Sequence, residues 1–268
     1  MRFGSDRPQE ELRLPQRENC SASLNLRVAG CNHLFCALSP EDRERISLHL
    51  ESVHLEAQQI LYDADQCIEW AYFPLNCVVS LLTVMEAGAA IEVATVGREG
   101  IVGLPILLGV NQVPGRAMVQ IPGEALRLPV EILRAEIEQR GLLYHQLQRY
   151  AQALFDQVTQ LAACDRLHSI EQRLCRWLLM TQDRVGEGQF PLTQASLAQM
   201  LGVRRATVSV IAAQLQRSNL IRYRRGQMEI LDRSGLEEVV CECYGKIRCQ
   251  QLFISTDDSM NQSVSALG

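Results

Sequence analysis

The 268-residue sequence lacks a run of about 18 apolar residues, the length that a membrane-spanning helix needs. Its first twenty residues mix acidic and basic side chains and contain no apolar core of a secretion signal. We therefore expect a cytoplasmic protein with no membrane partner.

Motifs that carry out common enzymatic reactions are also missing. The sequence has no nucleophile elbow and no phosphate-binding glycine loop, and its five histidines never place two on one predicted strand. We predict that the protein is not an enzyme and that it carries no cofactor.

Acidic residues are absent from one long segment. Residues 188–228 contain no Asp or Glu, although the whole chain has a net charge of −5. The same segment contains six arginines, namely Arg204, Arg205, Arg217, Arg222, Arg224 and Arg225. A local cationic surface in an acidic protein is typical of nucleic-acid binding.

Ten cysteines are present, but without an export signal we expect them to stay reduced, because disulfides are rare in reducing compartments. Two groups are candidate metal ligands: Cys31 and Cys36 with His33 between them, and Cys241 and Cys243 with Cys249. The sequence offers no second pair of ligands that would complete either group, so we predict no metal site.

Changes in polarity and hydrophobic periodicity divide the chain into five segments. Residues 1–28 and 251–268 are polar and unpatterned, which predicts flexible tails. Short β-type runs separated by glycine and proline predict an antiparallel, jelly-roll-like β-roll over residues 29–140, after a short helix that starts at Ser39-Pro40. Residues 141–167 predict a long helix and residues 168–250 a winged helix-turn-helix, so the fold class is α+β.

The long helix carries an apolar stripe with heptad spacing. Its members are Leu143, Leu147, Tyr150, Leu154 and Leu161. Such a narrow stripe favours pairing with the same helix of a second copy, so we predict a homodimer. The alternative is that the stripe packs on its own β domain. His145 and His168 are interpreted as polar residues beside this stripe.

The helix-turn-helix prediction rests on local signals. Thr193 is a suitable N-cap, and Gly202 suits a tight turn. In the second helix Val208, Ala212 and Leu215 recur at helical spacing, so Arg205 falls on the opposite, outward face. A basic hairpin that turns at residues 225–227 follows the second helix.

The motifs LAQMLG, RRATVS and LIRYRRG, behind a β-rich domain and a long helix, resemble the Crp/Fnr superfamily of transcription regulators over about residues 30–245. The resemblance implies a cyclic-nucleotide-binding-type β-roll, a dimerisation helix, and a winged helix that binds a two-fold symmetric operator in double-stranded DNA. It also implies that RNA polymerase is a partner if the protein activates transcription.

Residue by residue, the resemblance places Arg205 on the arginine that reads guanine and Thr207 on the threonine that holds phosphate. The residues expected to contact DNA are Thr193, Arg204, Arg205, Thr207, Ser209, Arg222, Arg224 and Arg225. Ala206 and Val210 stand where the family often has Glu and Arg, so the operator half-site should differ from the best-known one.

The sensor motif departs further from the family pattern. Leu104 follows Gly103 where nucleotide-binding members carry an acid, and Ala117 follows Arg116 where they carry Ser or Thr. We expect Gly103, Leu104 and Arg116 at an effector pocket that does not bind cyclic nucleotides. The alternative for Arg116 is a salt bridge at the rim, with Glu92, Glu99 or Glu124 as its partner.

The Fnr-like branch holds an iron-sulfur cluster on closely spaced N-terminal cysteines. Cys20, Cys31 and Cys36 lie too far apart for that pattern. Two alternative functions remain: a redox- or metal-responsive regulator that uses these three cysteines, and a nucleotide-sensing module that acts without DNA.

Overall fold

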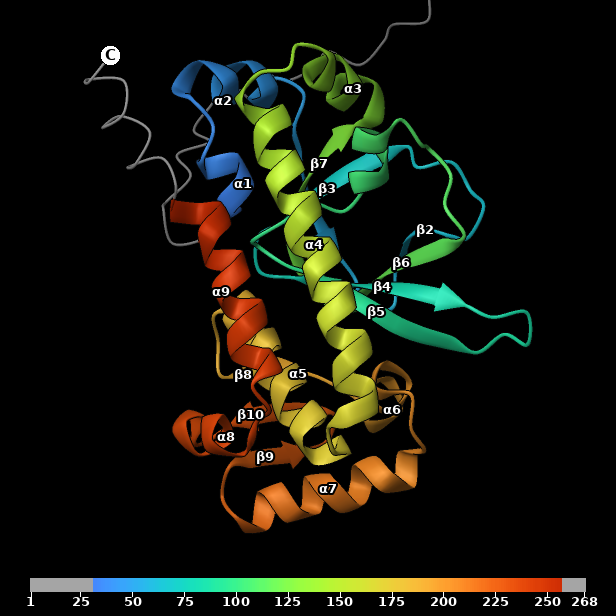
Figure 1. Cartoon of the computed structure of the whole chain (residues 1–268), viewed down its shortest axis with the longest axis vertical. Helices are drawn as coiled ribbons and strands as arrows, with labels where there is room; N and C mark the ends of the chain where they lie inside the picture. The colour runs from blue at the N-terminus through green and yellow to red at the C-terminus, as the bar shows by residue number, and fades with distance from the viewer. Residues whose placement is uncertain (1–30, 257–268) are drawn as a thin grey trace, which may run out of the picture.

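The computed structural model describes residues 31–256, which form a β-rich body and a mainly helical body connected by one long helix (Figure 1). The first body begins with α1 (His33–Cys36) and α2 (Pro40–Ser47). Helix α2 starts where the sequence predicts, because the Ser39 side chain accepts a hydrogen bond from the Asp42 amide at 3.1 Å.

Seven strands build the β-rich body. They are β1 (Glu51–Leu55), β2 (Ile60–Tyr62), β3 (Trp70–Pro74), β4 (Val78–Val84), β5 (Ala90–Val96), β6 (Gly115–Ile121) and β7 (Gly123–Pro129). They form two antiparallel sheets of order β1-β7-β3 and β2-β6-β4-β5, with the short helix η2 (Leu104–Leu108) between β5 and β6. Buried residues of both sheets, such as Phe73 and Val119, share one core, so the predicted antiparallel β-roll is confirmed.

After the roll come α3 (Val130–Glu138) and the long helix α4 (Leu142–Leu167). The stripe predicted to meet a second copy faces inward instead. Leu143, Leu147, Tyr150 and Leu161 are only 3%, 1%, 3% and 7% exposed within their own chain, and Leu154 is half-buried at a cavity beside the β-roll. This part of the prediction is wrong because a helix that covers a β-roll also needs a narrow apolar face, and spacing alone does not say which body covers that face.

The second body contains α5 (Ile170–Val185), α6 (Gln194–Leu201), α7 (Arg205–Arg217) and α8 (Arg233–Val239). Three short strands, β8 (Gln189–Pro191), β9 (Ile221–Arg224) and β10 (Gln227–Ile230), form an antiparallel sheet of order β8-β10-β9. This is the predicted winged helix-turn-helix. The wing turns on two residues, Arg225 (φ 51°) and Gly226 (φ 76°), as in a type I′ turn, so Gln227 belongs to β10 rather than to the turn.

A last helix, α9 (Cys243–Thr256), runs beside α4 towards α1 (Figure 1). The predicted tail boundary at residue 251 is therefore wrong, because residues 246–256 contain no glycine or proline that would end the helix there. Residues 1–30 and 257–268, which include Cys20 and the remainder of both predicted tails, lie outside the described part. No helix between residues 31 and 256 is long and apolar enough to cross a membrane.

The two bodies are docked through a buried arginine on α5. Arg184 is 2% exposed, and its Nε donates to Glu99 Oε1 at 2.8 Å. Its Nη2 donates to the Thr95 carbonyl and to Gln157 Oε1, both at 3.3 Å. In return, Arg98 donates from Nε to the Arg184 carbonyl at 2.8 Å. The Arg184 guanidinium therefore joins α5 to both the β-roll and α4.

A second polar contact lies beside the first. Trp177 on α5 donates from Nε1 to Glu92 Oε1 at 3.0 Å, and the Ser80 hydroxyl also donates to the Glu92 carboxylate. Burial raises the pKa of Glu92 to about 7, although both hydrogen bonds and the nearby Arg176 and Arg184 oppose this rise. Glu92 is thus part of the contact between the two bodies.

Replacing Arg184 with Met should lower the free energy of unfolding by about 3–5 kcal/mol, because the change removes the cation from the buried Glu99 carboxylate. Denaturant titration of the full chain, followed by tryptophan fluorescence, measures this loss. The matched control is Arg222→Met, which breaks an ion pair whose side chains are 61% and 35% exposed and should cost less than about 1 kcal/mol. Equal losses for the two variants would contradict the role assigned to Arg184.

Candidate nucleic-acid interface

Helices α6 and α7 are joined by a tight turn that local chemistry specifies. Thr193 caps α6, its Oγ1 accepting from the Ser196 amide at 3.0 Å. Gly202 ends α6 with φ 65°, a left-handed conformation that glycine adopts without strain, and α7 begins three residues later. Both signals were predicted from the sequence, and the structure confirms them.

Helix α7 has one buried face and one outward face. Val208, Ile211, Ala212 and Leu215 are at most 9% exposed and pack on α6 and the wing. The outward face carries Arg205, Ala206, Val210, Ala213 and Arg217. Val210 is 59% exposed on this face, and the helix lies at the end of the molecule away from the β-roll (Figure 1). Helix α7 therefore presents a long accessible face that begins with an arginine.

The predicted contact residues differ in solvent exposure and in whether their side chains already form hydrogen bonds. Arg204 and Arg205 are exposed at the start of α7, and Thr207 is half-buried in its first turn. Ser209 donates to Gln194 Oε1 at 2.7 Å, so its hydroxyl joins the two helices. Arg217 was not among the contact residues predicted from the sequence, although the helical period from Ala206 through Val210 reaches it.

The wing is basic at its tip. Arg224 and Arg225 are exposed there. Arg222 lies opposite Glu229 in the hairpin, and its Nη1 is 2.8 Å from Glu229 Oε2. Arg222 is therefore paired with Glu229, which comes directly after the acid-free segment, but its side chain is 61% exposed and its contact with DNA stays a prediction.

Residues 172–239 match the sequence pattern of the Crp-like helix-turn-helix domain. The chain carries a Crp-like helix-turn-helix domain. The match runs from the first turn of α5 to the end of α8 and so includes the whole turn, recognition helix and wing.

Solved structures share the fold over most of this chain. FixK2 from Bradyrhizobium japonicum is similar with a TM-score of 0.60 at 15% identity, covering 72% of this chain and 98% of its own. A putative Crp/Fnr-family transcriptional regulator from Eubacterium rectale has a TM-score of 0.57 at 17% identity, covering 77% and 96%. The c-di-GMP-responsive global regulator CLP of Xanthomonas campestris has a TM-score of 0.56 at 14% identity, covering 72% and 99%. No curated protein sequence matches the chain.

The domain match and the shared fold confirm the resemblance to Crp/Fnr regulators, and they support a DNA-binding regulator. They concern the architecture and the helix-turn-helix.

The predicted effector pocket is formed only in part. A cavity of about 220 Å³ lies between the β-roll and α4. It is lined by Tyr62, Leu81, Ile101, Val102, Gly103, Leu104, Pro105, Leu108 and Leu154. Gly103 and Leu104 line this cavity, and Arg116 is not part of its largely apolar lining, so an effector site here stays a prediction.

Arg116 is held elsewhere by an acid that the sequence analysis did not consider. Its Nε and Nη2 donate to the two carboxylate oxygens of Asp63 at 2.8 and 2.9 Å. The three proposed partners are engaged in other contacts: Glu92 and Glu99 at the docking contact, and Glu124 with His54 at 2.7 Å. Arg116 is therefore a salt-bridge residue, and the structure corrects the identity of its partner.

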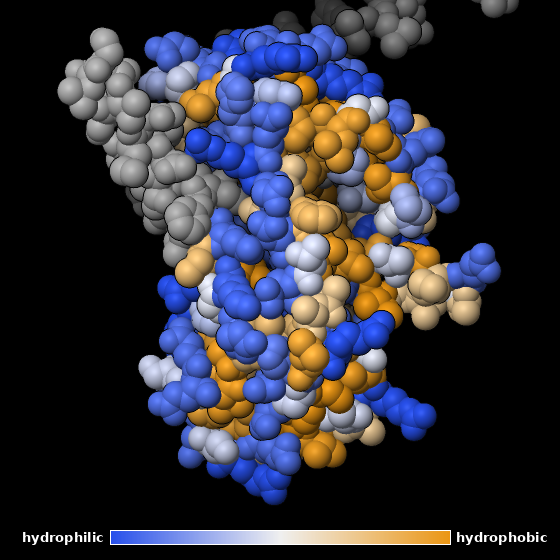
Figure 2. Space-filling model, viewed as in Figure 1, coloured by the Kyte–Doolittle hydropathy of each residue, from blue (hydrophilic) through white to orange (hydrophobic). Residues whose placement is uncertain are grey.

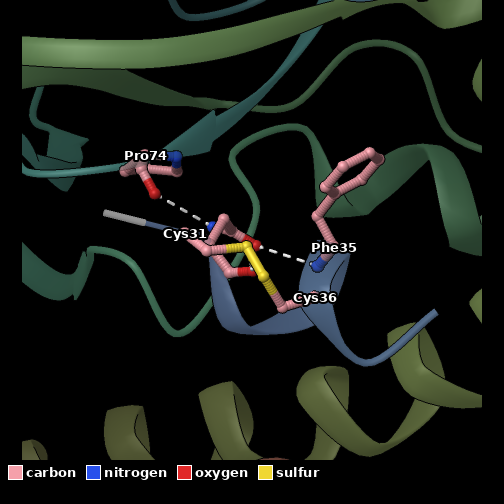
Figure 3. Close-up of a disulfide and its surroundings, with 5 residues drawn as sticks. Cys31, Phe35, Cys36 and Pro74 are labelled. Carbon is pink, nitrogen blue, oxygen red and sulfur yellow. Dashed lines mark hydrogen bonds between the residues drawn. A yellow bond between two sulfur atoms is a disulfide. The ribbon is translucent and has the colours of Figure 1, made fainter. Parts of the chain in front are cut away.

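Cys31 and Cys36 form a disulfide that closes α1 (Figure 3). Between them the Asn32 side chain donates to the carbonyls of Pro74 and Gly100 at 3.1 and 2.8 Å, which ties α1 to the roll. The expectation that the cysteines stay reduced is wrong for this pair, and so is the candidate metal site with His33. A disulfide is itself a redox couple, so the redox-responsive alternative remains a prediction.

Cyclic AMP and cyclic GMP should give no binding heat in calorimetry with the purified chain. A cyclic phosphate would have to displace Asp63 from Arg116, and the ribose would meet Leu104 instead of an acceptor. Micromolar binding that disappears in an Arg116→Met variant would contradict this expectation.

Proposed function

We propose that the protein is a sequence-specific transcription regulator that acts in the cytoplasm and binds a two-fold symmetric operator in double-stranded DNA as a homodimer. The observation that carries the proposal is the outward face of α7, which begins with Arg205 and lies in a Crp-like helix-turn-helix beside a basic wing. The β-roll is its regulatory domain, and RNA polymerase is a partner if the regulator activates.

The residues of α7 fit the chemistry of the major groove. Residues near the start of a recognition helix reach base edges, and an arginine there matches guanine through two hydrogen bonds. Val210 and Ala213 follow Arg205 on the outward face, and such small apolar side chains suit thymine methyl groups. Because Val210 stands where relatives often have arginine, this part of the half-site should be read through apolar contact.

Phosphate contacts come from the edges of this surface. Arg224 and Arg225 at the wing tip and Arg217 at the far end of α7 are exposed cations. Such residues position a protein on the duplex and make its affinity depend on salt, but they do not select a sequence. We assign Thr207 and Arg204 to the phosphates near the start of α7.

A different face of α4 supplies the dimer seam. Tyr144, Gln148, Ala151, Phe155, Val158 and Ala162 follow one another in alternating steps of four and three residues, and each of them is exposed or half-buried. Phe155 is 63% exposed, and Leu108 on neighbouring η2 is 72% exposed. In the same view as Figure 1, an apolar band runs down the molecule along α4 beside a hydrophilic band (Figure 2).

A second copy is the occupant that this face fits. A 4-3 repeat over six positions is the spacing that lets two helices pack along their length. An exposed aromatic at its centre costs free energy unless it is covered. Two α4 helices packed side by side would present both α7 helices to the same face of the duplex, one to each half of a symmetric site.

Arg205→Ala should relax the preference at one base pair in each half-site, with about 1–3 kcal/mol of discrimination lost, because a bidentate contact to guanine disappears. Arg224→Ala should weaken binding to all sequences alike and flatten the dependence on salt. Binding to a selected operator and to random duplex across a salt series separates the two effects. Equal losses on both duplexes for Arg205→Ala would mean that it holds phosphate, and no duplex binding by the unmodified chain would favour a sensing module that acts without DNA.

Phe155→Glu and Ala162→Glu should each convert the dimer to monomers, because a charge would be buried in the seam. Light scattering at micromolar concentration measures the mass. The matched control is Ala163→Glu, which adds the same charge to the adjacent exposed residue one-quarter turn away from the seam. A dimer that survives Phe155→Glu would contradict this seam, and a monomeric unmodified chain would contradict the dimer itself.

A further inference from the structure

Four metal-ligating side chains gather where α4 ends. Cys164, His168, Cys241 and Cys243 each offer one ligand atom, and these four atoms all lie within 4.8 Å of one another. The three cysteines are 0%, 3% and 0% exposed, whereas the His168 side chain is 15% exposed. The cluster is therefore buried on the cysteine side and accessible on the histidine side.

Two distant segments build the cluster. Cys164 lies in the last turn of α4, and His168 is its C-cap. Cys241 lies between α8 and α9, and Cys243 is the first residue of α9. Cys164 and Cys241 are 77 residues apart in the sequence, so folding alone brings the four side chains together.

We propose that these four residues bind one zinc ion in a closed tetrahedral site. The distances between them fit that geometry. Zinc with bonds of about 2.3 Å to sulfur and about 2.1 Å to nitrogen separates two sulfurs by about 3.8 Å, and a sulfur from a nitrogen by about 3.6 Å. In the structure Cys164 Sγ is 3.6 Å from Cys241 Sγ, and Cys243 Sγ is 3.6 Å from His168 Nδ1.

Surrounding groups orient the ligands. The other ring nitrogen of His168, Nε2, lies 3.0 Å from Glu242 Oε2, so a proton on Nε2 is held by this carboxylate and Nδ1 is left with a lone pair towards the thiols. A carboxylate behind a ligating histidine is the usual outer shell of a zinc site. Gln160 Nε2 donates to Cys243 Sγ at 3.0 Å, which supports the sulfur in its thiolate form.

A buried cation balances the charge of such a site. Three thiolates and one neutral histidine around Zn²⁺ carry a net charge of −1. Arg176 on α5 is 5% exposed, interacts electrostatically with Cys164, and has no hydrogen-bond partner for its buried Nε among the described residues. A negatively charged metal site beside Arg176 compensates a guanidinium that is otherwise costly to bury.

With all four positions filled by protein, the ion has no place for a substrate and acts structurally. It fastens the end of α4, next to the turn into α5, to the start of α9. Cys249, which the sequence pattern placed with Cys241 and Cys243, is exposed and lies outside the cluster. His168 belongs to the cluster and not to the helix stripe. This proposal does not depend on DNA binding.

The test uses the full chain, purified without chelators and with reductant. Elemental analysis should find one zinc per chain. Replacing zinc with Co²⁺ should give the intense visible bands of tetrahedral cobalt and a thiolate-to-cobalt charge-transfer band. Cys164→Ser and Cys241→Ser should lose the charge-transfer intensity of one sulfur each, and Glu242→Gln should weaken zinc binding by about 10–100-fold in competition with a chelator.

Cys249→Ser is the matched control, since it removes a cysteine from the same helix α9 but outside the cluster, and its cobalt spectrum should equal that of the unmodified chain. The zinc content and the cobalt spectrum of the unmodified chain test the proposal even if a cysteine variant fails to fold. A chain that contains no zinc and gives no tetrahedral cobalt spectrum would overturn the proposal. A disulfide between Cys164 and Cys241 in the reduced preparation, found by mass spectrometry of peptides, would overturn it as well.

Discussion

The position of the recognition helix depends on one buried ion pair. Arg184 reaches from α5 to Glu99, and the same guanidinium holds Thr95 of β5 and Gln157 of α4. The chain at Gly97 lies so close to this side chain that a Cβ atom there would be 2.5 Å from Arg184, so only glycine fits. Because α5 also supplies core residues to the helix-turn-helix, this contact fixes how the DNA-binding body is oriented on the β-roll.

A second attachment lies at the other end of the DNA-binding body. Helix α9 leaves α8 and runs back beside α4, and the proposed zinc site lies where the two helices meet. The body is thus held through α5 by charges and through α9 by thiol ligands. Helix α7 packs on α6 and β9 of this body, so both attachments bear on the orientation of its outward face.

Sequence patterns predicted what is decided within a few residues. The Ser39 and Thr193 caps, the left-handed Gly202 and the tight wing turn at Gly226 are each specified by local backbone chemistry, and each was found. The contacts of Arg184 and Arg116 were not predictable, because their partners lie 85 and 53 residues away and depend on how the sheets and helices pack. For the same reason the four members of the cysteine-histidine cluster were not grouped from the sequence.

Helix α4 shows why its apolar stripe was misassigned. A helix in the middle of an assembly carries several apolar faces, and their spacing alone does not say which partner each one meets. The face with Leu147 packs on the β-roll, the face with Gln160 and Cys164 meets α9, and the face with Phe155 remains open. The strongest stripe in the sequence was the one that the chain itself buries, because a core needs more continuous apolar surface than a helix pair does. What remains for a second copy is the weaker 4-3 repeat, in which Tyr144, Phe155 and Val158 are interspersed with one glutamine and two alanines. A partner on that face would therefore contact α4 directly. Because Gln157 and Cys164 of α4 belong to the two attachments, a shift of α4 would move both of them.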